Sequence, residues 1–294
     1  MMNYMSHASK MTGRRLPVVR TLLMLSTLFS LCTFSYVSAA STDTPDGSSL
    51  VKTTIELPLQ GVTLEYKANV RLLQVLDDAN ASGSIGYFPL SAQLFDQTNI
   101  ELNKANKDIE AKKRNVFNQL DAFTVEEPEA KLVKQQLASF QYLNRVFIEL
   151  DRNAVISQSD KNPLLVSSSY LEKTSVTQAQ TQRFSLYLPQ RPTSIQLIGA
   201  MKESVTMDLI EHGTLNDYLE ALPNGFVGEP ADKSVAYVVQ PDGVVQTIQY
   251  AYWNEQPVYL APGAIVFMAF YSLPSEYSTL NQDIVDLLRH KVGL

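Results

Sequence analysis

The sequence predicts an α+β fold with two consecutive domains, and three observations support this. The order of two strands, a helix and further strands occurs twice along the chain. A pair of charged helical stretches interrupts the first of these cycles, and another helical stretch ends the chain. The length of 294 residues and the 45% hydrophobic content allow one large core or two modest ones without disulfides or metals.

The first 40 residues have the three-part organisation of a secretory signal peptide. Four basic residues and no acidic one precede an apolar or small-residue run over 21–37, and Ser38, Ala39 and Ala40 complete a signal peptidase site. The run is shorter than the ~20 residues of a spanning helix, and a polar segment follows it. We expect cleavage after Ala40, in preference to an uncleaved anchor or a lipid anchor on Cys32.

Removal of residues 1–40 leaves 20 basic and 30 acidic residues, a net charge of −10. An acidic body gains nothing from phosphate contacts, which argues against nucleic acid as a partner. The single cysteine leaves with the leader, so the mature chain has no disulfide and no thiol chemistry. A thiol-free exported protein fits a bacterial periplasm.

The first cycle of elements follows a polar, flexible segment over 41–50. The runs 53–57 and 62–66 have strand composition and flank a Pro-Leu-Gln-Gly turn, which predicts a β-hairpin. Helical spacing of the apolar residues begins near 70–76. These elements open a first domain, which we place at 51–189.

Two amphipathic helical stretches interrupt this domain. Apolar residues recur every three or four positions in each, and an acidic segment around Pro128 separates them. We expect a helical hairpin inserted at about 99–144, with strands afterwards at 146–150 and 184–188.

The second cycle occupies 190–273 and repeats the order of the first. The expected elements are a hairpin (193–198 and 205–209), a helix (214–222), a second hairpin around Pro-Asp-Gly (236–239 and 244–248) and a fully apolar central strand (264–270). Because the architecture repeats while the sequence does not, we predict two domains of the β-grasp kind.

The C-terminal segment 275–294 predicts an amphipathic helix over about 278–292. Its apolar stripe consists of Leu280, Ile284, Leu287, Leu288 and Val292. A helix of this length is marginal alone in water, so the stripe must dock on something, and it is too short and too charged to span a membrane. Its own domain, a partner protein and the membrane surface remain open; Leu280, Ile284, Leu287 and Leu288 are the candidate docking residues.

The mature chain lacks the patterns of the common catalytic and metal sites. His212 and His290 have no second histidine or carboxylate at metal-ligand spacing, and no nucleophile elbow, phosphate loop or dinucleotide fingerprint occurs. Pairs of carboxylates remain open, because nothing in the sequence selects one. We predict a binding or assembly protein without metal or cofactor.

Several segments of the chain resemble the GfcC family of capsule biosynthesis proteins. They include Tyr-Leu-Pro-Gln-Arg-Pro-Thr at 187–193, Ala-Tyr-Trp-Asn at 251–254 and, more weakly, Asn-Pro-Leu-Leu-Val at 162–166. The resemblance covers most of the mature chain and is strongest over 183–292. It implies a periplasmic, non-enzymatic protein of Gram-negative bacteria with two β-grasp domains like the ligand-binding (SLBB-like) modules of the outer-membrane polysaccharide exporter, a helical hairpin in the first domain and an amphipathic C-terminal helix.

Three residues are candidate ligand contacts. Arg145 stands where the family carries a Gly-Arg step, with Asn144 in place of the glycine; it either binds an acidic sugar or caps a helix or pairs with an acid. Arg191 lies in the expected junction of the domains, as a ligand contact or part of a stiff linker. Trp253, the single tryptophan, is either a sugar platform or, as we favour, a core residue.

The functional prediction is a periplasmic accessory factor of capsule or surface polysaccharide biosynthesis or export. Its expected partners are the polysaccharide or an outer-membrane export protein, with peripheral membrane contact through the C-terminal helix as a further option. The alternative, from another class, is a polysaccharide-modifying enzyme with a carboxylate pair near Arg145.

Overall fold

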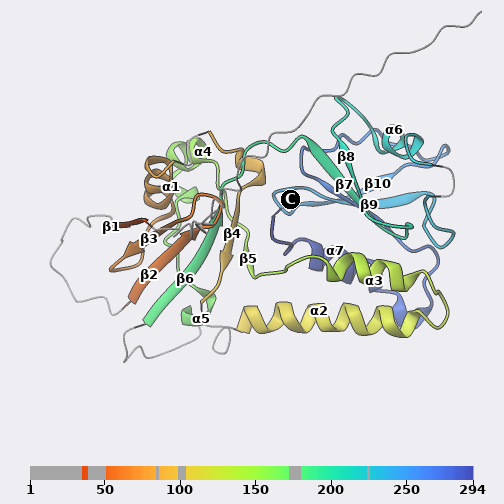
Figure 1. Ribbon diagram of the computed structural model, residues 1–294, viewed down its shortest axis with the longest axis horizontal. Coiled ribbons are helices and arrows are strands. Elements are labelled where there is room, and N and C mark those ends of the chain that lie inside the picture. The colour runs from red at the N-terminus through yellow and green to blue at the C-terminus, as the bar shows by residue number, and fades with distance from the viewer. Residues whose placement is uncertain are drawn as a thin grey trace, which may run out of the picture. The chain divides into compact units, whose positions relative to one another are not determined.

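The computed structural model describes residues 35–38, 51–83, 86–98, 104–171, 180–223 and 226–293 (Figure 1). The predicted signal peptide and the segment 41–50 lie outside these residues, except for β1 (Ser35–Ser38), which pairs in parallel with β3 (Val62–Tyr66). No helix in the described part of the chain is long and apolar enough to cross a membrane.

The first sheet has the β-grasp arrangement. Its other strands are β2 (Val51–Leu57), β4 (Gln93–Asp96), β5 (Arg145–Val146) and β6 (Gln180–Tyr187). The order is β1-β3-β2-β6-β4-β5, in which β2 and β3 form the predicted antiparallel hairpin and β2 pairs in parallel with β6. The last strand, β6, thus lies beside β2 in the middle of the sheet.

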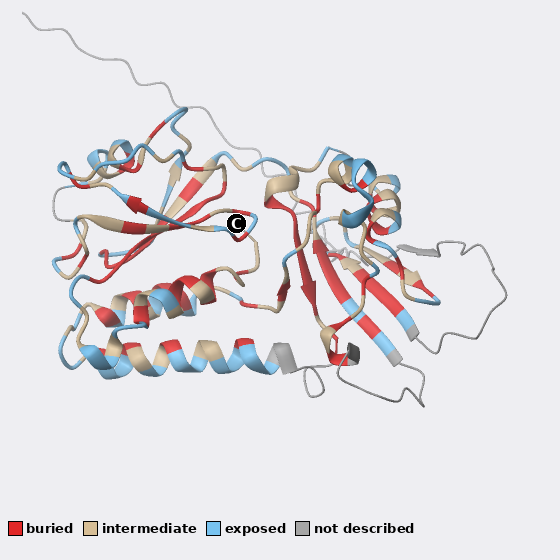
Figure 2. Ribbon diagram, turned by 180° about the vertical axis from the view of Figure 1, so that it is seen from behind, coloured by how far each residue is buried: buried red, intermediate tan, exposed pale blue. Residues whose placement is uncertain are grey.

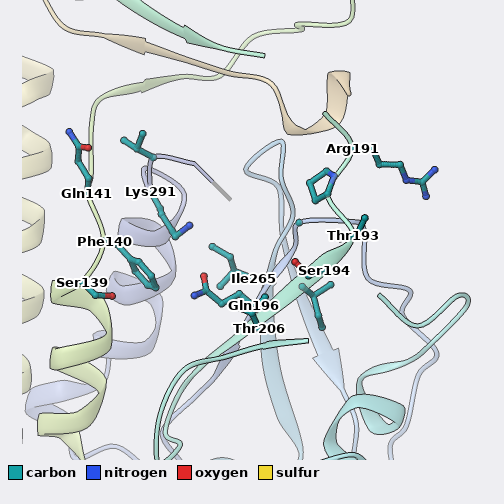
Figure 3. Close-up of a pocket in the computed structure, with 14 residues that line it drawn as sticks. Ser139, Phe140, Gln141, Arg191, Thr193, Ser194, Gln196, Thr206, Ile265 and Lys291 are labelled. Carbon is teal, nitrogen blue, oxygen red and sulfur yellow. The ribbon is translucent and has the colours of Figure 1, made fainter. Parts of the chain in front are cut away.

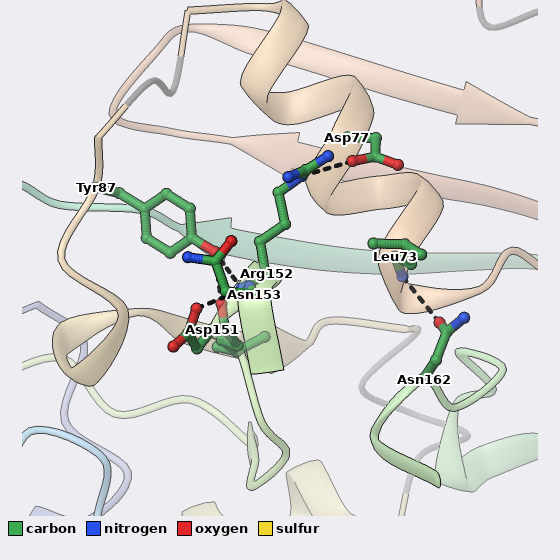
Figure 4. Close-up of polar contacts among 8 residues, drawn as sticks. Leu73, Asp77, Tyr87, Asp151, Arg152, Asn153 and Asn162 are labelled. Carbon is green, nitrogen blue, oxygen red and sulfur yellow. Dashed lines mark hydrogen bonds and ion pairs between the residues drawn. The ribbon is translucent and has the colours of Figure 1, made fainter. Parts of the chain in front are cut away.

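Helix α1 (Leu72–Ala81) covers this sheet with one apolar face. Leu72, Val75, Leu76 and Ala79 are buried in the first core. No side chain caps the helix locally, but the Asn162 amide oxygen accepts a hydrogen bond from the backbone N–H of Leu73 at 2.9 Å (Figure 4). A residue 89 positions away thus satisfies a backbone donor at the start of this helix.

A further contact joins the same helix to α4 (Arg152–Ser157). Arg152 Nε lies 2.6 Å from Asp77 Oδ1, and Asp151 caps α4 by accepting from the Asn153 N–H (Figure 4). The short elements η2 (Ser159–Lys161) and α5 (Ser168–Leu171) follow before β6.

The second sheet repeats the first. Its elements are β7 (Ser194–Gly199), β8 (Val205–Asp208), α6 (Leu215–Glu220), β9 (Val235–Val239), β10 (Val245–Gln249) and β11 (Ile265–Met268). The order is β10-β9-β11-β7-β8, with β7 parallel to β11. The predicted α+β class with two β domains is therefore confirmed.

The central strand of the second sheet is buried on both faces (Figure 2). In the central strand β11, Val266 and Met268 face the core that contains α6, whereas Ile265 and Phe267 face a layer of helices. This explains the unbroken apolar run in the sequence, since a strand covered on both sides has no polar face.

The helices on the second sheet come from distant parts of the chain. They are α2 (Lys104–Phe123), α3 (Ala130–Ala138) and α7 (Leu280–Leu288), and their apolar residues share one core with β7, β9 and β11 (Figure 1). The hairpin is inserted between strands of the first sheet in sequence, yet it packs on the second sheet. Gln136 of α3 fixes this contact, because its amide accepts from the Gly199 N–H at 2.8 Å and donates to the Gly199 carbonyl at 3.1 Å.

The structure differs from the predicted elements in several places. The strand expected at 146–150 is reduced to β5, because the chain then turns toward α4. Strand β4 and the 3₁₀ turn η1 (Pro89–Ser91) before it were not predicted. All four residues of β4 are buried, so the strand has no alternation of apolar and polar residues. The C-terminal helix begins at Leu280, after the 3₁₀ turn η3 (Ser275–Tyr277).

Candidate functional site

The apolar stripe of α7 lies inside the protein. Leu280, Ile284 and Leu287 have no exposed surface, and Leu288 has 2%. They pack with α2, α3 and the second sheet. The expectation that these four residues dock on a partner or a membrane is therefore corrected: the chain's own core already covers them, as in the own-domain alternative.

Arg145 is buried where the two domains meet. Its Nη2 donates to the carbonyl oxygen of Pro241 at 2.6 Å, in the turn between β9 and β10 of the second sheet, and lies 3.5 Å from the carbonyl oxygen of Ala92 in the first domain. Burial lowers the pKa of this guanidinium to about 10. It neither caps α3 nor forms an ion pair among the described residues; it joins the domains through backbone carbonyls.

Phe147 completes this contact between the domains. Its ring lies 5.4 Å from the Arg145 guanidinium and 4.6 Å from that of Arg289, which also donates to the Gly243 carbonyl at 2.8 Å. His290 stacks on the same ring edge-on and accepts the Arg145 backbone N–H through Nδ1 at 3.3 Å. Burial lowers the pKa of His290 to about 4.

Three acids accompany Arg145 around a hollow of about 670 Å³: Glu149, Asp151 and Asp242. Glu149 accepts from the Asp151 N–H at 3.0 Å and from Lys161 at 3.1 Å, and hydrogen bonding to Asp151 is the largest cause of its lowered pKa. Asp151 is the cap of α4. A general acid needs a raised pKa, so Glu149 does not fit that role. The contacts of Glu149 and Asp151 stabilise the backbone of the loop and the start of α4.

Trp253 is not a core residue, and the favoured expectation was wrong. Its side chain is 76% exposed and that of its neighbour Tyr252 is 96% exposed. Both lie in the turn after β10, in the long connection to β11 that also carries the exposed Tyr259. The aromatic pattern suggested a buried strand, but the turn bonded from Asn254 N–H to the Ala251 carbonyl at 2.9 Å projects these rings outward.

A cavity of about 530 Å³ lies between the end of α3, the domain linker and the second sheet; we call it the seam cavity. Its lining residues are Ser139, Phe140, Gln141, Arg191, Pro192, Thr193, Ser194, Ile195, Gln196, Thr206, Gly263, Ile265, Lys291 and Val292. In Figure 3 the Lys291 side chain extends into this space, whereas the Arg191 side chain points away from it. Arg191 is exposed at the rim, with its guanidinium 5.6 Å from the Phe88 ring.

Lys291 was missed by the sequence analysis. It is only 7% exposed, and burial lowers its pKa to about 8. Its ammonium donates to the Gly293 carbonyl at 3.1 Å and lies 5.0 Å from the Phe140 ring. The sequence shows a lysine next to the apolar stripe of the C-terminal segment. Nothing in the sequence indicates that this lysine lies on a cavity wall and not in solvent.

The described residues contain no group of histidines, cysteines and acids that would hold a metal ion. Residues 203–293 match the protein family described as "Capsule biosynthesis GfcC C-terminal". This match includes both Trp253 and Lys291. The chain is also 27% identical over 164 residues to the uncharacterized protein YjbG of Escherichia coli (strain K12), and the similarity covers 54% of this chain and 59% of YjbG. The chain thus spans less than two thirds of the length of this relative.

Proposed function

We propose that the protein, whose residues 203–293 match the family described as capsule biosynthesis GfcC C-terminal, is a periplasmic accessory factor that binds a surface polysaccharide during its assembly or export. The periplasmic location is inferred from the secretory leader that the sequence of residues 1–40 predicts. Binding, in place of turnover, is the role that we assign to the two β-grasp domains.

The observation that carries this proposal is the exposure of Trp253. A tryptophan that is 76% exposed beside a tyrosine that is 96% exposed leaves a large apolar area in water. Such exposed aromatic side chains mark interaction sites, and their flat faces suit the C–H faces of sugar rings. The pair lies within the segment that matches the capsule biosynthesis family.

The acids near Arg145 favour binding over catalysis as the proposal. Glu149 has a lowered pKa and already accepts hydrogen bonds from Asp151 and Lys161. Asp151 caps a helix, and Arg145 is turned onto backbone carbonyls. The polysaccharide-modifying alternative would need a protonated acid at this hollow, and Glu149 is poorly suited to supply it.

The test is polysaccharide binding by two variants. Trp253→Ala should weaken binding of capsular polysaccharide from the source bacterium at least about tenfold, as expected for an aromatic anchor. Tyr271→Ala is the matched control, because Tyr271 is 67% exposed and lies outside this connection. Titration calorimetry measures both, and the melting temperature should not change in either variant.

Two results would contradict the proposal. Equal binding by Trp253→Ala and wild-type protein would remove the aromatic platform, and release of shortened polysaccharide during the titration would show an enzyme. Capture of an outer-membrane export protein without polysaccharide would replace the glycan by a protein partner. Cell fractionation with N-terminal sequencing tests the location, and a mature chain beginning at Ser41 is the expected result.

A further inference from the structure

The seam cavity has a charge opposite to that of the protein. The chain has a formal net charge of −6, with 30 acidic residues. Among the described residues that line the cavity, the charged ones are Arg191 and Lys291, and none is acidic. An electropositive hollow on an acidic protein favours an anionic occupant.

Burial of the Lys291 side chain is unfavourable in free energy. Its ammonium is buried, and among the described residues it has no carboxylate within 4.0 Å. Burying a cation without an anionic partner is unfavourable. Burial lowers the pKa of Lys291 to about 8, which is still above neutral pH and leaves the ammonium form favoured. As far as the described residues go, the cavity therefore contains a positive charge without a carboxylate partner.

The backbone on both sides of Lys291 is fixed by partners far away in the sequence. The Val292 N–H donates to the Gln141 carbonyl at 2.9 Å, and the Gly293 N–H donates to the Gln93 side chain at 2.9 Å. Gln93 Nε2 in turn donates to the Lys291 carbonyl at 3.4 Å. These contacts keep the ammonium at the cavity wall, so a ligand meets a preorganised charge.

We propose that the seam cavity binds a carboxylate-bearing sugar residue, with the Lys291 ammonium as the partner of the carboxylate. This inference rests on the proposed polysaccharide-binding function and specifies the chemistry of its ligand. The site lies apart in sequence from the Trp253 turn, and it is formed by the end of α3, the linker, the second sheet and the chain after α7.

The other lining groups suit a sugar acid better than a small inorganic anion. The Phe140 ring beside the ammonium offers a flat apolar face to a pyranose. Ser194, Gln196 and Thr206 supply hydroxyl and amide groups of both donor and acceptor type. A volume of about 530 Å³ is within the range of small-molecule sites and exceeds the needs of a single phosphate.

The experiment compares a trisaccharide of galacturonic acid with its methyl ester, in which each carboxylate is replaced by a neutral and slightly larger ester group. The free acid should bind the full-length mature protein, and the ester should bind at least roughly tenfold more weakly, as for loss of a charged hydrogen bond. Lys291→Met, which retains the length of the side chain and removes the charge, should abolish this difference. Lys67→Met is the matched control at an exposed lysine and should behave as wild type.

Three outcomes would overturn the inference. They are equal binding of acid and ester by the wild-type protein, unchanged preference in Lys291→Met, and inorganic phosphate that competes at lower concentration than the trisaccharide. A chain extended by two glycines after Leu294 is a second control and should retain the preference.

The two proposals can fail separately. If Lys291→Met binds the capsular polysaccharide like wild type while Trp253→Ala does not, polysaccharide binding stands and the seam cavity is not its acid site. If the trisaccharide acid binds through Lys291 while neither Trp253→Ala nor wild type binds polysaccharide, the cavity serves another sugar acid and the capsule function fails.

Discussion

Replacement of Ile284 by alanine tests whether α7 is packed inside the protein in solution. Ile284 has no exposed surface and lies in the core shared by α2, α3, α7 and the second sheet. Removing three buried carbon atoms at such a site costs the transfer free energy plus that of the remaining cavity. We expect a loss of about 3 kcal/mol in the free energy of unfolding and a melting temperature lower by about 6–12 °C.

Urea unfolding followed by circular dichroism measures this change. Gln282→Ala is the control on the same helix, because Gln282 is exposed and its substitution should cost no more than about 0.5 kcal/mol. A loss below about 1 kcal/mol for Ile284→Ala, together with weaker capture of a partner, would refute the internal packing of the stripe. In that case the stripe would be a docking surface after all.

Three further predictions concern the junctions around the second sheet. Gln136→Ala leaves the Gly199 N–H without its acceptor and should cost about 1–3 kcal/mol in urea unfolding. Gly243→Ala should destabilise the protein, because Gly243 has a φ of +88° and an added Cβ would lie 2.4 Å from the Phe147 ring; calorimetry should show a lower melting temperature than for alanine at the open Gly83. Burial lowers the pKa of His290 to about 4, so His290 remains neutral in the folded protein while the unfolded chain gains a proton below about pH 6.5. The free energy of unfolding should therefore fall between pH 6.5 and 4. The variant His290→Gln should reduce that fall in unfolding experiments.

The sequence predicted the elements that have a strong local signal. The hairpins, the helices and the central strand β11 were found because period, turn residues and apolar runs are local properties. The repeated order of elements was sufficient to predict an α+β class with two β domains. Strand β4 was missed because all of its four residues are buried and it therefore has no distinct period. Helix α4 was missed because it is short and a single capping aspartate is its main sequence signal.

The functional residues were harder to place, because exposure and proximity are tertiary properties. Arg145 and Arg191 were expected as candidate ligand contacts. Only the structure shows that the Arg145 side chain is turned onto backbone carbonyls and that Arg191 lies at the rim of a cavity. Trp253 was expected in the core because it lies in a strand-rich segment of the sequence, whereas a turn carries it into solvent.

The sequence by itself determined the α+β class and the need of the C-terminal stripe for a docking surface, whereas the secretory leader and a mature chain without cysteine stay predictions. It did not determine which surface covers that stripe, because a stripe specifies burial and not a partner. The tertiary structure decided that a hairpin inserted in one domain and the helix at the chain end cover the sheet of the other. The same packing places Lys291 in a cavity, since its position depends on bonds to Gln93 and Gln141, both far away in the chain.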